Sequence, residues 1–226
     1  MKKTSTEKKC LFDLSCLKSS PSEKTKEQLI QNALLHFARF GYEGASLRDI
    51  CKDSGTNVSS VKYHFGDKAN LYKACIQHFI ENRLKKINLI LTPSENLEEY
   101  KVKMKLFLID FVDEGLSNID LIKLINREIE NLSPMMEDVF QNTFLRLFEK
   151  LVSISAHGIE KGYLRRDIDP VTVAKIILNT INMAIRNDHI SERYFNCSLK
   201  DNVYKEQLIS EMISIIINGM NKRESV

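Results

Sequence analysis

The sequence predicts an all-α protein of about nine helices: an N-terminal three-helix domain with a helix-turn-helix, followed by a larger helical C-terminal domain. Three observations support this prediction. Only four prolines and eight glycines occur in 226 residues. Apolar residues recur at the i, i+3, i+4, i+7 spacing of one buried helix face along most of the chain. Residues 44–72 combine helix-capping residues with a glycine-containing turn, which is typical of two short helices packed at an angle.

The first helix is expected over residues 22–40. Its apolar stripe consists of Ile30, Ala33, Leu34, Phe37 and Ala38, and Gly41 ends it. Residues 1–22 lack helical periodicity and mix lysine with serine, so they are expected to form a flexible tail, although Leu11–Leu17 are apolar enough for a short docking turn.

The second and third helices are predicted from their ends. Ser46 is expected to cap the second helix, with Asp49 completing a pair that resembles a capping box. Gly55 ends this helix because glycine reaches the left-handed conformation without steric cost. Asn57 is then expected to cap a third helix over residues 58–64.

The fourth helix is expected to begin near Asp67 and to reach about Leu89, before a break at residues 92–94. The remaining periodicity predicts helices over residues 96–115, 118–131, 135–161, 170–187 and 203–220, with a polar, non-helical stretch over 189–202. The expected organisation is a tail (1–22), a helix-turn-helix domain (23–83) and a C-terminal domain (84–226).

Charge is distributed unevenly along the chain. Residues 24–86 contain eleven Lys/Arg and six Asp/Glu, whereas residues 87–226 contain seventeen Lys/Arg and twenty-one Asp/Glu. Because residues 24–86 are basic and the rest of the chain after them is acidic, we expect a polyanionic partner to bind only at the N-terminal end. Because no apolar run approaches the roughly 20 residues of a membrane span, no membrane partner is expected. The five cysteines follow no metal-binding spacing, so reduced thiols and a cytoplasmic location are expected.

A third helix that reads DNA needs short polar side chains at its start and longer donors for phosphates. Ser59, Ser60 and Lys62 meet this need, while Val61 and Phe65 are expected to point inward. The string Val61-Lys62-Tyr63-His64-Phe65-Gly66-Asp67-Lys68, with Ser46–Ile50 before it, resembles the DNA-binding domain of the bacterial TetR family of transcriptional regulators, and most closely its CecR-like members.

The resemblance implies which further residues contact DNA. Residues at the positions of Tyr63 and Lys68 contact phosphates in that family, and the capping positions Ser46 and Asn57 do so as well. Each assignment has an alternative: Ser46 and Asn57 as caps only, His64 as a packed ring, Lys62 as a solvated lysine, and Arg48 in an ion pair with Asp49 or Asp53. The predicted DNA-binding set is Ser46, Arg48, Asn57, Ser59, Ser60, Lys62, Tyr63, His64 and Lys68.

The resemblance also implies a homodimer through the last two helices and a pocket for a small apolar or amphipathic effector in the C-terminal domain. The candidate interface stripes are Val171, Ala174, Leu178, Ile181 and Ile185, and Leu208, Met212, Ile215 and Ile216, with ordinary intramolecular core as the alternative. The candidate pocket residues are Met104, Phe107, Phe111, Arg127, Phe140, Phe144 and Met183, with core packing or surface ion pairing as the alternative.

The predicted function is therefore that of a dimeric transcriptional regulator, a ligand-responsive repressor that binds a palindromic operator. The fourth helix, from Lys68 to Leu84–Leu89, is expected to transmit ligand binding to the DNA-binding domain. The alternative is a related DNA-binding protein without a ligand, in an architectural or division-associated role. No catalytic residues, metal site or cofactor are expected, because nucleophile, phosphate-loop and paired-cysteine motifs are missing from the sequence.

Overall fold

The computed structural model describes residues 20–131 and 134–219, and within these ranges the chain forms helices without a β-strand. The predicted all-α fold is confirmed. The elements are α1 (Pro21–Gly44), α2 (Leu47–Asp53), α3 (Val58–Phe65), α4 (Lys68–Ile90), α5 (Leu97–Ser117), α6 (Ile119–Glu130), the 3₁₀ turn η1 (Pro134–Met136), α7 (Glu137–Val139), the π-helical segment η2 (Phe140–Phe144), α8 (Leu145–Glu160), α9 (Pro170–Arg186), α10 (Asp188–Phe195) and α11 (Asn202–Asn218).

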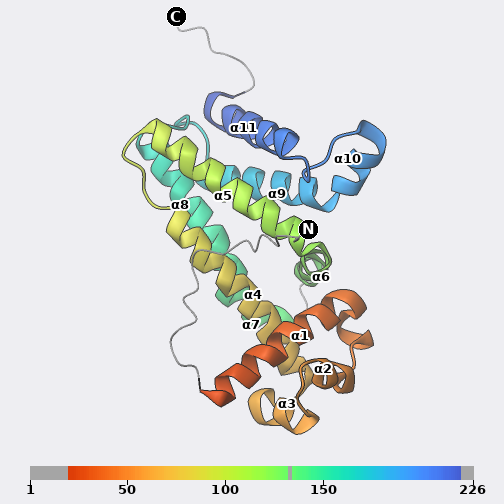
Figure 1. The fold of residues 1–226 in the computed structure, drawn as a ribbon. Coiled ribbons are helices and arrows are strands. Elements are labelled where there is room, and N and C mark those ends of the chain that lie inside the picture. The colour runs from red at the N-terminus through yellow and green to blue at the C-terminus, as the bar shows by residue number, and fades with distance from the viewer. Residues whose placement is uncertain (1–19, 132–133, 220–226) are drawn as a thin grey trace, which may run out of the picture.

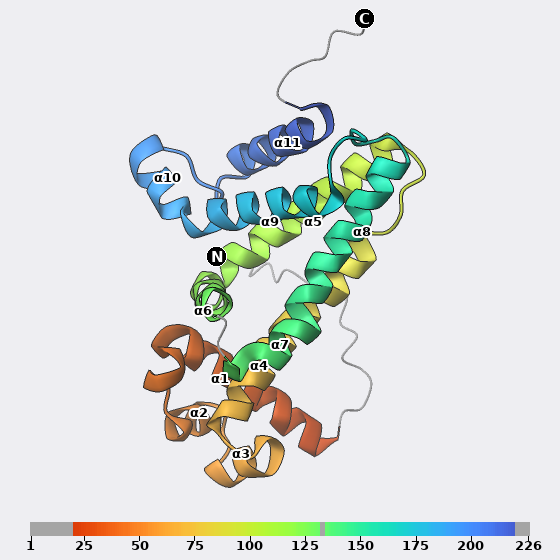
Figure 2. The same cartoon turned by 180° about the vertical axis from the view of Figure 1, so that it is seen from behind.

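The molecule is elongated, with α1–α3 at one end and α11 at the other (Figure 1). We call α1–α3 and the start of α4 the head, and the remaining elements the body. The long helix α4 leaves the head and continues into the body, and α8 runs beside it (Figure 2). Helices α5, α9 and α11 pack together at the far end of the body.

Helix α1 starts earlier than the sequence predicts. Ser20 and Glu23 form a reciprocal capping box: the Glu23 N–H donates to Ser20 Oγ (3.2 Å) and the Ser20 N–H donates to the Glu23 carboxylate (2.7 Å). Residues 20–22 are thus part of the helix start rather than of the predicted tail. The rest of that tail, with Leu11–Leu17, Cys10 and Cys16, lies outside the described residues.

Gly41 interrupts α1 as expected. Its φ of 71° is in a region that L side chains rarely adopt, so the helix kinks here and the chain turns toward α2.

The single helix predicted over 135–161 is wrong in its first third, where η1, α7 and η2 precede α8. In η2 the Leu145 N–H donates to the Phe140 carbonyl, five residues back. The buried Thr143 hydroxyl donates to the Val139 carbonyl, which removes an acceptor that a regular helix would use. The spacing of apolar residues does not reveal that a side-chain hydroxyl competes with a backbone N–H for this carbonyl.

The prediction that residues 189–202 are non-helical is also wrong, because α10 covers residues 188–195. Asp188 is buried, and its carboxylate accepts hydrogen bonds from Leu199 N (2.7 Å) and Ser198 Oγ (2.8 Å). Asn196, in the left-handed conformation, ends the helix. Tyr194 and Phe195 point to solvent, so α10 lacks the apolar stripe that identifies a packed helix.

The proposed interface stripes are mostly intramolecular core. Ala174, Ile181, Ile185 and Met212 are buried within a single protomer, and only Ile215 of the two stripes is exposed. The reason is that α9 and α11 pack their apolar faces on α5, which the sequence pattern of each helix does not show.

The described residues form two apolar cores, which divide along α4. Ile80 belongs to the head core and Leu84, one turn later, to the body core. The head core also includes residues from beyond α4: Met136 of η1, Val139 of α7 and one face of α6, which packs against α1. Its buried members from α1 and α6 are Leu29, Ile30, Ala33, Phe37, Leu121, Ile122, Leu124 and Ile125. Helix α6 is therefore bound to the head although it lies in the C-terminal part of the sequence.

Leu124→Ala tests this attachment. Leu124 is 5% exposed, and its truncation leaves a cavity between α6 and α1. We expect the free energy of unfolding, measured by urea denaturation, to fall by about 2–5 kcal/mol. The matched control is Leu89→Ala, at a position that is 81% exposed, where we expect a change within about 0.5 kcal/mol. Equal, small effects of both substitutions would show that α6 is not part of the head core.

Candidate nucleic-acid interface and body cavity

The turn between α2 and α3 is held by hydrogen bonds within the segment. Gly55 has φ of 66°, and the Thr56 N–H donates to the Cys51 carbonyl (2.8 Å). Ile50 and Val61 are fully buried in the head core, and Phe65 packs against it. The inward positions predicted for Val61 and Phe65 are confirmed, and they fix which side of α3 faces outward.

The two predicted caps differ. Asn57 Oδ1 accepts from the Ser60 N–H (2.9 Å) and from Ser60 Oγ (3.2 Å), so the cap of α3 is confirmed. Ser46 makes no side-chain capping hydrogen bond, and the predicted pair with Asp49 is therefore wrong. Ser46 does have the extended backbone of a capping residue, but its hydroxyl is not used by the helix.

The outer side of α3 is polar and accessible. Ser59 and Lys62 are exposed, and Tyr63 is 80% exposed. Ser60 and His64 are half-buried; the His64 ring lies 4.8 Å from that of Tyr63 and 6.1 Å from that of Phe65. Helix α3, which carries these side chains, lies at the end of the molecule opposite α11 (Figure 1).

The remaining predicted residues flank α3. Lys68, in the first turn of α4, donates to the Glu43 carbonyl (3.2 Å) and lies 4.8 Å from the Tyr42 ring, a contact that the sequence pattern does not indicate. Arg48 is exposed and forms no ion pair with Asp49 or Asp53 in the described part of the chain; Asp53 contacts His36 instead (2.8 Å). The suggested Arg48–Asp53 pair is therefore absent from this part of the chain.

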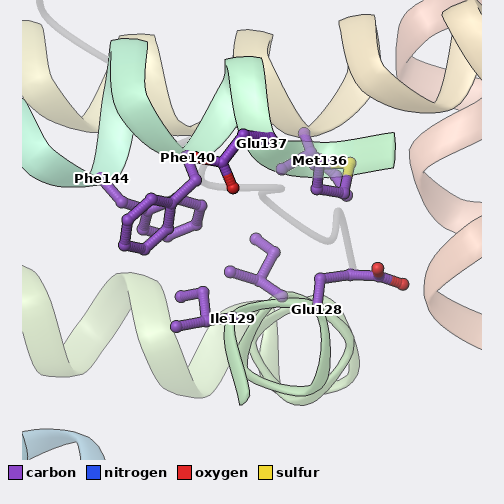
Figure 3. Close-up of a pocket in the computed structure, with 8 residues that line it drawn as sticks. Glu128, Ile129, Met136, Glu137, Phe140 and Phe144 are labelled. Atoms are coloured by element: carbon purple, nitrogen blue, oxygen red, sulfur yellow. The ribbon is translucent and has the colours of Figure 1, made fainter. Parts of the chain in front are cut away.

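A cavity of about 340 Å³ lies in the body, between α4, α5, α6, η2, α8 and α9. Its wall is mainly apolar, with four polar residues, and is formed by Phe79, Ile80, Arg83, Phe111, Ile122, Ile125, Asn126, Ile129, Phe140, Phe144, Leu145, Leu147, Phe148, Leu178, Asn179 and Asn182. Beside it is a narrow crevice in which Phe140 and Phe144, stacked at 5.9 Å, point from η2 toward Ile129 of α6 (Figure 3).

The structure brings together only part of the predicted pocket. Phe111, Phe140 and Phe144 line the cavity. Met104 and Phe107 do not, because they lie in the body core, and Met183 is 55% exposed. Arg127 is exposed on the side of α6 that faces Gly41 of α1. Helical rotation explains the positions of Arg127 and Met183, since their neighbours Asn126 and Asn182 line the cavity and a step of one residue turns a side chain by about 100°. Phe107 and Met104 share a face of α5 with Phe111, but they lie one and two turns farther along the helix and pass the end of the cavity.

Most of the cavity wall is missing from the predicted set, including two polar residues, Arg83 and Asn126. Arg83 stands where the stripe of Phe79 and Ile87 predicts an apolar residue, so its position in that stripe was the available signal.

Head and body also meet through a polar contact. The buried Tyr72 hydroxyl of α4 donates to Glu128 of α6 (2.9 Å), and burial, with the neighbouring Glu128 carboxylate, raises the pKa of Tyr72. Tyr72 therefore stays a neutral donor, and this hydrogen bond adds to the apolar contacts between α6 and the head.

Comparison with known proteins identifies the head. Residues 25–75 match the family of bacterial regulatory proteins described as the tetR family. This head is a TetR-family DNA-binding domain. A Shigella flexneri transcriptional dual regulator, CecR, is 42% identical over 55 residues, which cover 24% of each chain. The TetR-like resemblance of the sequence is thereby confirmed.

Similarity beyond the head is more distant. The Bacillus subtilis probable transcriptional regulator YttP is 23% identical over 156 residues, covering 68% of this chain and 72% of YttP. The solved structure of the transcriptional regulator FadR from Bacillus subtilis, in complex with stearoyl-CoA, has a TM-score of 0.70 at 14% identity, covering 86% of this chain and 99% of FadR. The relatives are transcriptional regulators, in agreement with the prediction that this protein is not an enzyme.

Two further properties of the described residues bear on possible partners. None of their helices is both long and apolar enough to cross a membrane. Within the same ranges, no three His, Cys, Asp or Glu side chains are grouped so as to hold a metal ion.

Asn57→Ala separates capping from DNA contact. Because the Asn57 side chain satisfies the Ser60 N–H, we expect its loss to lower the free energy of unfolding by about 0.5–2 kcal/mol. Ser46→Ala, which removes no capping bond, should change it by less than about 0.5 kcal/mol. Chemical denaturation of both variants is the measurement, and a larger loss for Ser46→Ala would contradict the capping assignment.

Proposed function

We propose that this TetR-family protein is a dimeric, ligand-responsive repressor that binds a partly palindromic DNA operator. The observation that carries the proposal is the geometry of α3. Its inner side is fixed by Val61 in the head core, and its outer side offers polar, accessible side chains at the end of the molecule. That is the arrangement needed by a helix that enters the DNA major groove.

In this proposal the head residues have two kinds of role. Ser59, Ser60 and Lys62 approach base edges or the adjacent phosphates, and His64 lies beside them. Tyr63, Lys68, Arg48 and the starts of α2 and α3, at Ser46 and Asn57, contact phosphates. A phosphate near the start of α4 would be favoured both by the Lys68 charge and by the helix dipole.

The dimer is proposed to form through the exposed sides of α9 and α11. Ile176 and Met183 of α9 and Ile215 of α11 are each about half-exposed (47%, 55% and 50%), which leaves an apolar surface on helices whose opposite sides are in the core. A two-fold axis through this surface would place two α3 helices on one side of the duplex. Successive major grooves on that side are one turn, roughly 34 Å, apart.

The effector site is proposed to be the body cavity. At about 340 Å³ it is within the size range of small-molecule sites, roughly 300–1,000 Å³, and it is mainly apolar with a few polar groups. The similar fold of FadR, solved with stearoyl-CoA, supports a ligand-binding body over the alternative of a ligand-free DNA-binding protein.

Two helices connect this cavity to the head. Helix α4 contributes Phe79, Ile80 and Arg83 to the cavity and starts in the head at Lys68. Helix α6 lines the cavity with Ile122, Ile125 and Asn126 and belongs to the head core. A ligand that prefers one position of these helices would change the spacing of the two heads, whereas a ligand with equal affinity for both positions would not.

Lys62→Ala tests the DNA-binding surface. Lys62 is exposed, so its loss should leave the fold intact while removing a cation from α3. If it neutralises a phosphate, the slope of log K against log[salt] should decrease by about 0.9. If it reads a base, discrimination at one position should fall by about 1–3 kcal/mol. Binding is measured by fluorescence anisotropy on a duplex selected from a random pool.

The control is Lys101→Ala on α5, a lysine paired with Glu98 far from α3. It should leave both the slope and the sequence preference unchanged. Failure of the wild-type protein to select any duplex sequence, or identical behaviour of both lysine variants, would overturn the proposed function.

A further inference from the structure

The cavity wall contains two polar groups that the protein leaves without partners. Arg83 Nη1 and Asn126 Nδ2 are buried and form no hydrogen bond within the described residues. Both residues line the cavity, on α4 and α6 respectively. The third such atom, the Tyr100 hydroxyl, belongs to a residue outside the cavity wall. Two unpartnered donors therefore meet at one apolar cavity.

Arg83 also has no carboxylate partner in the part of the chain that the structure describes. Only 7% of Arg83 is exposed, and its guanidinium lies between the rings of Phe111 (4.3 Å) and Phe79 (5.8 Å). Its one hydrogen bond among the described residues is long, from Nη2 to the Phe111 carbonyl (3.5 Å). A buried guanidinium with so few partners is costly, because an isolated charge strongly prefers water.

Of the two carboxylates whose charges act on Arg83, Glu114 and Asp110, neither forms an ion pair with it in the described part of the chain, and Glu114 is engaged elsewhere. Glu114 accepts from Lys86 Nζ (2.9 Å) and from Asn118 Nδ2 (3.0 Å). Burial lowers the pKa of Arg83, while the charges of Glu114 and Asp110 raise it. Because a guanidinium keeps its proton in proteins, Arg83 remains a cation that faces the cavity without a bonded counter-ion.

We propose that the effector is an apolar molecule with one carboxylate, which Arg83 and Asn126 bind through their free N–H groups. A carboxylate accepts the two parallel N–H groups of a guanidinium, and such charge-assisted hydrogen bonds are among the strongest in proteins. The apolar part of the molecule fills the space among the phenylalanine rings of η2, α5 and α8. This inference rests on the proposed function in so far as the cavity is the effector site.

The size of the cavity limits the apolar part. At roughly 30 Å³ for each water molecule, about 340 Å³ corresponds to about eleven waters. Decanoate has a similar number of non-hydrogen atoms and is the probe that we choose. Decanol is the matched neutral probe, because it keeps the chain and loses the charge.

The position of the two donors also suggests how the carboxylate acts. Arg83 is fifteen residues beyond Lys68, or roughly 22 Å along α4 at 1.5 Å per residue. Asn126 is on α6, which packs in the head core. One carboxylate would thus bind both helices that connect the cavity to the head.

The experiment is calorimetric titration of the full-length protein with decanoate and with decanol. We expect decanoate to bind at least tenfold more tightly than decanol. Arg83→Met should reduce decanoate affinity by at least about tenfold, since it removes a charged hydrogen bond, and should leave decanol affinity within about twofold. Asn126→Leu should weaken decanoate several-fold.

The matched control is Arg186→Met. Arg186 is also a body arginine, but it pairs with Glu130 (2.9 Å) outside the cavity wall, so its loss should not change decanoate binding. An independent readout is stability without ligand. Arg83→Met should unfold at the same or a higher urea concentration than the wild type, because it replaces an unpaired buried charge by an apolar chain.

Three outcomes would overturn the inference: equal affinities for decanoate and decanol, unchanged decanoate binding by Arg83→Met and Asn126→Leu, or no binding of any straight-chain carboxylate from hexanoate to hexadecanoate. Operator binding by the wild-type protein is measured in parallel. Sequence-selective DNA binding without carboxylate binding would reject this inference and leave the DNA-binding function intact. Carboxylate binding without DNA binding would reject the proposed function instead.

Discussion

The packing of α6 against α1 is the contact on which the rest of the structure depends. It places a helix from the C-terminal part of the chain in the core of the DNA-binding head, through Leu121 and Leu124. The adjacent side of the same helix, with Ile122 and Asn126, forms part of the cavity wall. Because protein interiors are close-packed, a shift of α6 at the cavity must be accommodated by the head. The cavity and the head are therefore joined by the apolar contact of α6 with α1 as well as by the continuous backbone of α4.

Polar interactions join the same helices and their neighbours in the body. The Tyr72–Glu128 hydrogen bond joins α4 to α6 beside the head core. The Lys86–Glu114 ion pair joins α4 to α5 in the body, and Lys205–Asp113 joins α11 to α5. Both ion pairs involve an exposed or half-exposed group and contribute less than burial does. In the cavity itself, by contrast, Arg83 and Asn126 each have a buried donor with no partner among residues 20–131 and 134–219.

Much of the head was predictable because its signals are local. Gly41, Gly55 and Asn57 act within a few residues of themselves, and the outward side of α3 follows from the inward side chains of Val61 and Phe65. The cavity was less predictable because it depends on how distant helices are rotated against each other. Phe111 and Phe107 are one turn apart on α5, yet only Phe111 reaches the cavity. Helix α10 escaped prediction because Asp188 holds its start through bonds to residues ten and eleven positions later.

Native-state hydrogen exchange of the amides of α6 and α1 tests the central claim most directly. If the two helices share one core, their most protected amides should open together, with opening free energies that agree within about 0.5 kcal/mol and fall in parallel as urea is added. The Leu124→Ala variant should lower both by the same amount. The claim that α6 is part of the head core would be contradicted if α6 opened together with α9, at a free energy distinct from that of α1. It would also be contradicted if Leu124→Ala had no effect on α1.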